Sequence, residues 1–132
     1  MKKIVMSLAT ATLLIGSVGS GPASAHQRTE PTRLSIHVNT KNIDAGEKVK
    51  FKGRLKSDWH RCVKFKKVSL FKGTKKVLTK ETTRSGRYRF SRSPKNTNEW
   101  HVEFAGKRLR GAHPHVHRCL SSESKSIRVR VS

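Results

Sequence analysis

The sequence is short of acidic residues. It has 8 aspartates and glutamates among 132 residues, against 30 lysines and arginines, so its formal net charge is +22. Such a charge favours anionic partners and opposes the binding of bare cations, unless a site offers strong ligands. Four acids lie in or near expected strands and turns, without the spacing of a paired-carboxylate catalytic site; they are Asp44, Asp58, Glu99 and Glu103.

Long apolar runs are also scarce, and the main one lies at the N-terminus. Residues 4–18 follow two lysines and precede a small-residue segment that ends at Ala25. This order is typical of a secretory signal peptide, and the run is too short and too rich in Ser, Thr and Gly to span a bilayer comfortably. We expect residues 1–25 to be a signal peptide and residues 26–132 to form one secreted domain, extracellular or associated with the cell wall. The alternative is an uncleaved membrane anchor; no second apolar segment follows.

Cysteine is limited to Cys62 and Cys119. In an exported chain such a pair is expected to form one disulfide bond, and the alternative is two buried free thiols. The disulfide would leave no thiol nucleophile. It would also tie the longest irregular stretch, residues 106–125, to the loop after the second expected strand. Such a tether is expected, because untethered loops of this length are uncommon.

Alternation of apolar and polar residues recurs through residues 32–131, with turn signals between the segments. This is the period of half-buried strands, and no helical period is present. The expected strands cover residues 34–38, 48–56, 67–71, 76–79, 87–91, 100–104 and 127–131. The pattern predicts an all-β sandwich or barrel of about seven antiparallel strands, preceded by a polar arm at residues 26–31. Aromatic residues at inward positions are expected in the core; they are Phe51, Tyr88, Phe90, Trp100 and Phe104. Gly53 also falls on the inward face, where it leaves room for a bulky neighbour.

The order of these segments resembles bacterial immunoglobulin-like domains. The clearest motifs are G-x-x-V-x-F-x-G-R-L at residues 46–55 and T-T-x-S-G-x-Y-x-F at residues 82–90. The cysteine pair and the histidine-rich run at residues 113–117 resemble those of a subset of small secreted proteins of the actinobacterial type. The resemblance implies an immunoglobulin-like sandwich in a secreted or cell-surface protein, with no catalytic residues and a spacer, accessory or binding role.

Basic residues gather on one expected sheet face. Side chains along a strand alternate sides, and in an immunoglobulin-like topology the strand at residues 87–91 pairs near the strand at residues 48–56. The shared face would carry Lys48, Lys50, Lys52, Arg54, Lys56, Arg87 and Arg89. We predict that it binds an extracellular polyanion, such as a wall polymer, an acidic polysaccharide or another anionic surface. The alternative is a merely solvated surface on an inert structural domain.

The opposite sheet is expected to carry a mixed surface. Glu99 and Glu103 can face Arg128 and Arg130 across a strand pair, which would neutralise that surface. Sequence-specific nucleic-acid binding is not expected, because no helix is available for a groove and the outward faces lack aromatic residues for base stacking.

Alternating histidines provide a second candidate site, at His113, His115 and His117. In extended backbone the three imidazoles would share a side, and imidazoles two residues apart can chelate Zn or Cu. His60 or His26 could provide a further ligand. The alternatives are a Zn- or Cu-binding exported protein and a structural loop whose imidazoles hydrogen-bond to the backbone.

No enzyme or cofactor is expected from the remaining residues. The sequence contains no nucleophile elbow, although a serine, histidine and aspartate from distant segments can meet in space. Trp59 lies in a loop close to Cys62 and is expected to pack on the disulfide or on the long loop, or to stack on a ligand.

Overall fold

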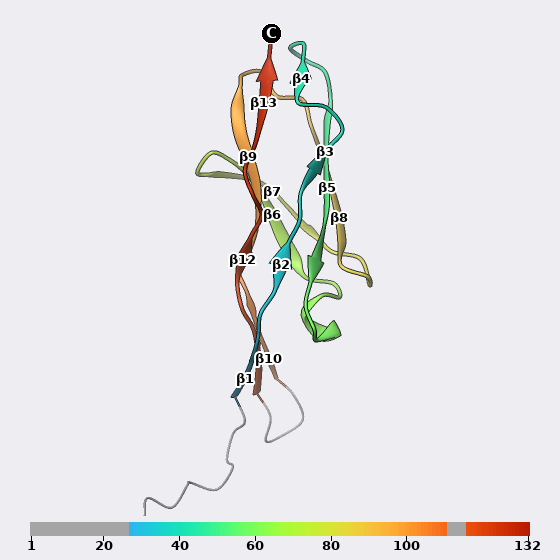
Figure 1. The fold of residues 1–132 in the computed structure, drawn as a ribbon, viewed down its shortest axis with the longest axis vertical. Coiled ribbons are helices and arrows are strands. Elements are labelled where there is room, and N and C mark those ends of the chain that lie inside the picture. Colours follow the sequence, from blue (N-terminus) through green and yellow to red (C-terminus); the bar gives the residue numbers. More distant parts are fainter. Residues whose placement is uncertain (1–26, 111–115) are drawn as a thin grey trace, which may run out of the picture.

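The computed structural model describes residues 27–110 and 116–132, which form an elongated, two-layered all-β molecule (Figure 1). This part of the chain has thirteen strands, one short 3-10 helix and no α-helix. None of its helices is long and apolar enough to cross a membrane. The signal peptide predicted for residues 1–25 lies outside the described residues.

The first layer is a four-stranded antiparallel sheet built around β5 (Val49–Lys56). One edge of β5 pairs with β8 (Arg87–Arg92). The other edge pairs in turn with β2 (Arg33–Leu34) and β3 (His37–Val38). Buried and exposed residues alternate along β5, which places its apolar side chains toward the second layer and its basic ones in solvent.

The second layer has the strand order β4–β13–β9–β6–β7. These strands are β4 (Asn42–Ile43), β13 (Ile127–Val131), β9 (Asn98–Phe104), β6 (Lys67–Lys72) and β7 (Lys75–Glu81). A further short strand, β12 (Ser122–Glu123), pairs with the end of β9, so β12 and β13 follow one another along β9. The pairing of β4 with β13 is parallel.

A three-stranded ribbon extends the molecule beyond the two main sheets (Figure 1). Its central strand, β11 (Val116–Cys119), pairs in parallel with β1 (Gln27–Glu30) and antiparallel with β10 (Lys107–Arg110). The ribbon therefore joins the N-terminal end of the described chain to residues 107–110 and 116–119, whereas the C-terminus lies at the opposite end of the molecule (Figure 1).

The hydrophobic core lies between the two sheets. Phe51 of the first sheet and Trp100 of the second are both fully buried, and their ring centroids are 5.0 Å apart. The predicted aromatic core is confirmed, since each member is at most 4% exposed: Phe51, Tyr88, Phe90, Trp100 and Phe104. Burial of large aromatic side chains is the main contribution to the stability of such a small domain.

Gly53 has the role predicted for it. It lies opposite Tyr88 in the β5–β8 ladder, and the Tyr88 hydroxyl donates a hydrogen bond to the backbone carbonyl of Ser35 across the space that a side chain at Gly53 would fill. Ser35 also interrupts the expected strand at residues 34–38, because its hydroxyl accepts a hydrogen bond from the Arg54 N–H at 3.0 Å. The expected strand is therefore divided into β2 and β3.

The predicted disulfide is confirmed. Cys62 ends the short 3-10 helix η1 (His60–Cys62), Cys119 ends β11, and their Cα atoms are 5.5 Å apart. Both residues are fully buried. The bond attaches the three-stranded ribbon to the segment that follows β5.

Three expectations about the strands are wrong. Residues 26–31 were expected to form a polar arm, but residues 27–30 form β1. Residues 106–125 were expected to be irregular, but they contain β10, β11 and β12. The strands are not all antiparallel, since β1–β11 and β4–β13 are parallel pairs. These short polar strands lack an apolar alternation, and backbone pairing and the disulfide hold them in place.

Candidate cationic binding face

The outward face of the first sheet is built by the alternation of β5. Val49, Phe51 and Leu55 point into the core, whereas every second side chain is exposed and basic. The exposed set on β5 is Lys50, Lys52, Arg54 and Lys56. Lys48 is also exposed but precedes the strand by one residue.

The neighbouring strands extend this row in both directions. Lys52 lies opposite Arg89 of β8 on one side and His37 of β3 on the other, and Arg54 lies opposite Arg87. Lys56 lies opposite Arg33 of β2. The predicted pairing that adds Arg87 and Arg89 to the face is confirmed, and Arg33 and His37 join it. We call this set the cationic face: Arg33, His37, Lys50, Lys52, Arg54, Lys56, Arg87 and Arg89.

The cationic face has no compensating acid. The four strands β2, β3, β5 and β8 contain no aspartate or glutamate, and none of the lysines and arginines on the face forms an ion pair with a described carboxylate. Arg54 alone is held by a neighbour, since its Nε donates to the Ser85 carbonyl at 3.0 Å. Lys50 and Lys56 are six residues apart along the strand, which corresponds to about 20 Å. The face can therefore contact several successive anionic groups.

Like charges directly opposite each other destabilise a sheet, by about 0.2–1 kcal/mol for each pair. The ladder positions Lys52–Arg89, Arg54–Arg87 and Arg33–Lys56 all have this arrangement. An anionic ligand would relieve the repulsion at all three positions at once.

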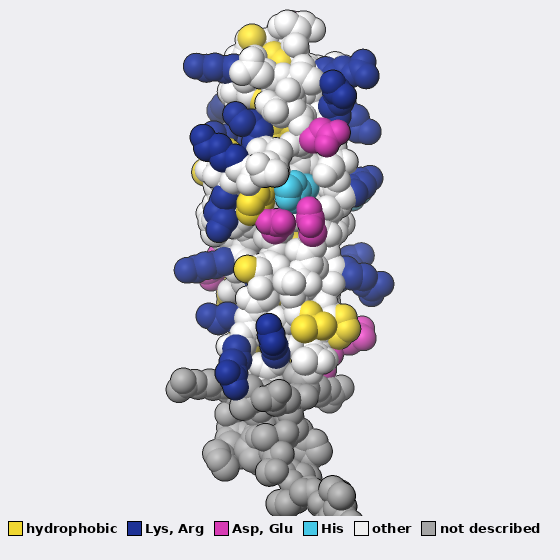
Figure 2. Space-filling model, turned by 90° about the vertical axis from the view of Figure 1, so that its left-hand side faces the viewer, with side chains coloured by type: hydrophobic (Ala, Val, Ile, Leu, Met, Phe, Trp, Pro, Cys, Tyr) yellow, Lys and Arg dark blue, Asp and Glu magenta, His cyan; other side chains and the backbone are white. Residues whose placement is uncertain are grey.

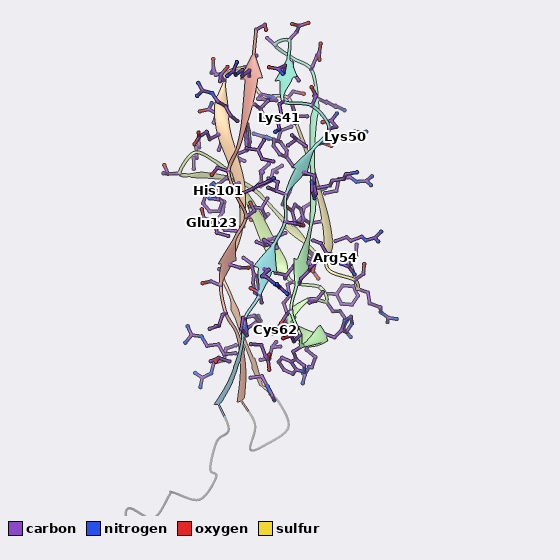
Figure 3. All side chains as sticks on the ribbon, in the orientation of Figure 1. Lys41, Lys50, Arg54, Cys62, His101 and Glu123 are labelled. Atoms are coloured by element: carbon purple, nitrogen blue, oxygen red, sulfur yellow. A yellow bond between two sulfur atoms is a disulfide. The ribbon has the colours of Figure 1, made fainter. Side chains whose placement is uncertain are left out.

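The second sheet has a mixed outer surface, as predicted. Figure 2 shows this side of the molecule, with acidic and histidine side chains in the middle and lysines and arginines along both margins. Arg128 lies opposite Glu99, as expected. The expected pairing of Glu103 with Arg130 is wrong, because β12 places Glu123 opposite Glu103 and β4 places Asn42 opposite Arg130. Figure 3 shows that Lys50 and Arg54 lie on one side of the sandwich, and His101 and Glu123 on the other.

The predicted histidine site is described only at His117. His113 and His115 lie outside the described residues, as does His26. The ring of His117 packs on Trp59 with centroids 4.1 Å apart, and the Arg61 guanidinium lies 5.3 Å from the centre of the Trp59 ring. Trp59 thus packs on His117, which belongs to the segment that was expected to be a long loop. Metal binding by His113, His115 and His117 stays a prediction.

A second concentration of cations surrounds Lys66 near the disulfide. Burial lowers the pKa of the Lys66 ammonium below its ordinary value, and the positive charges of Lys107, Arg61 and Lys64 lower it further. Glu81 opposes this effect. The Lys66 Nζ also donates to the Lys64 carbonyl at 3.2 Å.

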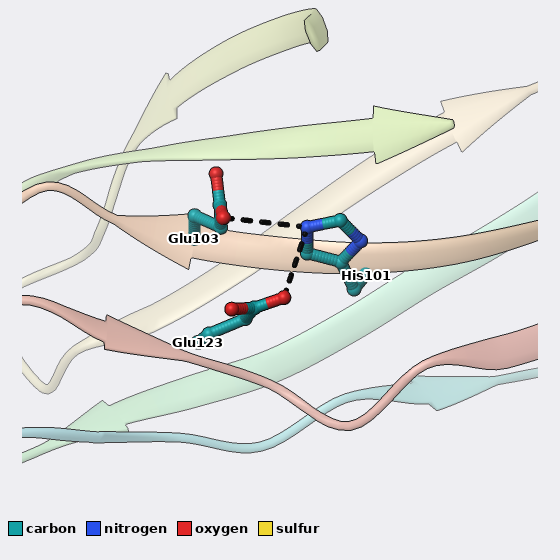
Figure 4. Close-up of side chains that lie close together, drawn as sticks. All are labelled: His101, Glu103 and Glu123. Carbon is teal, nitrogen blue, oxygen red and sulfur yellow. Dashed lines mark ion pairs between the residues drawn. The ribbon is translucent and has the colours of Figure 1, made fainter. Parts of the chain in front are cut away.

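The part of the chain that the structure describes contains one group of metal-ligand type, which sequence reasoning missed: His101, Glu103 and Glu123 (Figure 4). His101 and Glu103 are two residues apart on β9 and share its outer face. Their spacing could have indicated a pair of ligands. Glu123 could not have been added from the sequence, since it lies in a segment expected to be irregular.

Comparison with known proteins adds no family assignment. No protein-family model matches the chain, and no curated protein matches it significantly.

Proposed function

We propose that the protein is a secreted, non-catalytic module that binds an extracellular polyanion through the cationic face. One observation carries this proposal: the outer surface of the first sheet gathers seven lysines and arginines and one histidine, with no acidic residue on its four strands. The matching polymers outside a cell are wall polymers rich in phosphate and acidic polysaccharides. Binding releases the counterions that such polymers condense, so it weakens as salt is added.

Three further observations support the secreted immunoglobulin-like assignment. The pattern of residues 1–25 is typical of a signal peptide, which would direct export. The buried Cys62–Cys119 disulfide fits an oxidising compartment. Two packed sheets with β5 and β8 adjacent agree with the motif order that resembles bacterial immunoglobulin-like domains.

The proposal is tested by titrating the protein with a teichoic acid, which is a phosphate polymer, and with heparin, which is a sulfated polysaccharide. We expect the affinity for at least one of them to fall steadily as sodium chloride is raised. Reversing both charges in Lys50→Glu/Lys52→Glu should weaken binding by about 30-fold or more, because each cation near an anionic surface contributes about 1 kcal/mol. Isothermal titration calorimetry at several salt concentrations measures both effects.

The matched control is Arg128→Glu/Arg130→Glu, which reverses two exposed charges at the same spacing on β13 of the other sheet. Its affinity should stay within a few-fold of the unmodified protein, and circular dichroism checks that both variants fold. Three results would contradict the proposal. They are an affinity that does not change with salt concentration, an equal loss of affinity in the two variants, and no binding to either polymer. The last result would leave an inert structural domain.

A further inference from the structure

The outer face of the second sheet holds three ligand-type side chains close together. The His101 Nε2 lies 3.5 Å from the Glu103 Oε1 and 3.3 Å from the Glu123 Oε1 (Figure 4). The three ligand atoms all lie within 4.8 Å of one another. His101 and Glu103 come from β9, and Glu123 is the ladder partner of Glu103 on β12.

These separations fit a tetrahedral divalent cation. Zn²⁺ binds histidine nitrogen and carboxylate oxygen at about 2.0–2.2 Å, so two of its ligand atoms are about 3.4 Å apart. The two distances from the His101 Nε2 agree with this value. A set of one imidazole and two carboxylates also suits Zn²⁺ better than Mg²⁺ or Ca²⁺, which prefer oxygen ligands alone.

The imidazole is already fixed in position. The His101 ring stacks on Phe71 of β6, with centroids 5.0 Å apart and planes 15° apart, and its side chain is only 12% exposed. A ligand whose ring is held by its neighbours loses little freedom when a metal binds. The carboxylates are more accessible, since the Glu103 and Glu123 side chains are 37% and 58% exposed.

The pair of glutamates is an independent sign that a cation belongs at this position. Two carboxylates directly opposite each other across an antiparallel ladder repel. The chain has 30 lysines and arginines for 8 acids, yet among the described residues Glu103 and Glu123 form ion pairs with His101 only. A divalent cation between the two carboxylates would remove the repulsion.

The cluster also has an open side. Glu103 and Glu123, but not His101, line a surface hollow of about 900 Å³, whose wall also includes Ser69, Thr79 and Lys76. Three protein ligands and an accessible fourth position are the arrangement of a Zn²⁺ site that can take water or a further ligand.

We propose that His101, Glu103 and Glu123 form a binding site for one Zn²⁺ ion on the second sheet. The site lies on the opposite layer from the cationic face and is independent of the polyanion proposal. It also differs from the predicted site at His113, His115 and His117.

The test is calorimetric titration of the full chain with Zn²⁺ in a buffer freed of metals. We expect one ion to bind, and we expect Glu123→Gln and His101→Gln each to weaken binding by at least about tenfold. In nuclear magnetic resonance spectra, the signals of the His101 ring should shift as Zn²⁺ is added and stop shifting at the concentration at which calorimetry shows saturation. At the same concentration, Zn²⁺ should raise the melting temperature of the unmodified protein more than that of Glu123→Gln, because the stability gained from a bound ion grows with its affinity.

Two controls separate this site from others. Glu99→Gln removes the same charge from an exposed position on the same strand and should leave the affinity unchanged. The triple variant His113→Gln/His115→Gln/His117→Gln should keep the bound ion. Loss of binding in the triple variant with retention in Glu123→Gln would overturn the proposal. Absence of Zn²⁺ binding to the unmodified protein would overturn it too, and would leave the cluster as histidine–carboxylate contacts alone.

Discussion

Single residues explain how the Tyr88 side chain of β8 reaches across β5 to the backbone of Ser35. Gly53 has no side chain, and the Tyr88 ring and hydroxyl take that space and reach the Ser35 carbonyl. Both the inward position of Gly53 and the need for a large neighbour follow from the alternation of the strand. The identity of the hydrogen-bond acceptor does not, because Ser35 is brought into place by the β2–β5 pairing.

A methyl group at Gly53 should destabilise the fold. A Cβ atom there would collide with the Ser35 carbonyl oxygen and with the Tyr88 side chain, and the first of these is backbone that cannot rotate away. We expect Gly53→Ala to lower the free energy of unfolding by about 1–3 kcal/mol or more, the usual effect of overpacking. Urea unfolding followed by tryptophan fluorescence measures this, and an unchanged midpoint would show that β2 can move aside.

Ionisation of Tyr88 should accompany alkaline unfolding. Burial raises the pKa of its phenol well above the usual value, whereas in the unfolded chain a phenol loses its proton near pH 10. The resulting stabilisation is complete below about pH 10 and is lost as the pH rises toward the folded-state pKa. Tyr88 is the only tyrosine, so tyrosinate absorbance at alkaline pH reports on it alone. We expect this absorbance to rise together with the loss of the circular dichroism signal. A rise near pH 10 in the folded protein would contradict the buried hydrogen bond.

The strands that could be predicted from the sequence differ from the others in what holds them in place. β5 and β13 alternate strictly between apolar and polar residues, so each specifies its own inward face. β1 and β10 have almost no apolar residues, and their positions depend on β11, a partner remote from β1 in sequence. The alternation rule applies where one face is buried against a core. It gives no signal for a ribbon held by backbone pairing and one disulfide.

The disulfide should contribute a large part of the stability. It closes a loop with a sequence separation of 57 residues, for which the chain-entropy model gives about 4 kcal/mol. We expect Cys62→Ala/Cys119→Ala to lower the free energy of unfolding by about 2–5 kcal/mol, measured by urea denaturation. Chemical reduction of the unmodified protein should lower the midpoint to a similar extent. A loss below about 1 kcal/mol in both experiments would mean that strand pairing alone holds the ribbon.

At the scale of the whole molecule, positive charge is separated by layer. The first sheet carries the cationic face, whereas the second sheet mixes acids and bases. The central row of the cationic face could be predicted from the sequence, because the lysines of β5 alternate with apolar residues. Sequence reasoning missed Arg33 and His37, whose places depend on how β2 and β3 align with β5, and it missed the contact between β9 and β12 that creates the histidine–glutamate cluster.

Salt should therefore stabilise this protein. Repulsion among the charges of a +22 chain opposes the compact state, and added salt screens it over a Debye length of about 10 Å at 0.1 M. We expect the melting temperature to rise by several degrees between about 10 mM and 300 mM sodium chloride, as followed by circular dichroism. Lys52→Glu, which places an acid between Arg89 and His37, should raise the melting temperature at low salt and reduce the benefit of added salt. A melting temperature that falls with salt would show that attractive pairs outweigh the repulsion.

The edge strands of the second sheet also affect how the protein behaves at high concentration. β7 forms one border of the second sheet and carries exposed Lys75, Lys76 and Lys80, and β4 at the other border is only two residues long. An unpaired edge strand is a template on which another copy of the chain can add a strand. Lysines on the edge strand and a short edge strand both oppose such pairing. Crowded molecules of this protein should therefore repel one another before their backbones can join into fibrils.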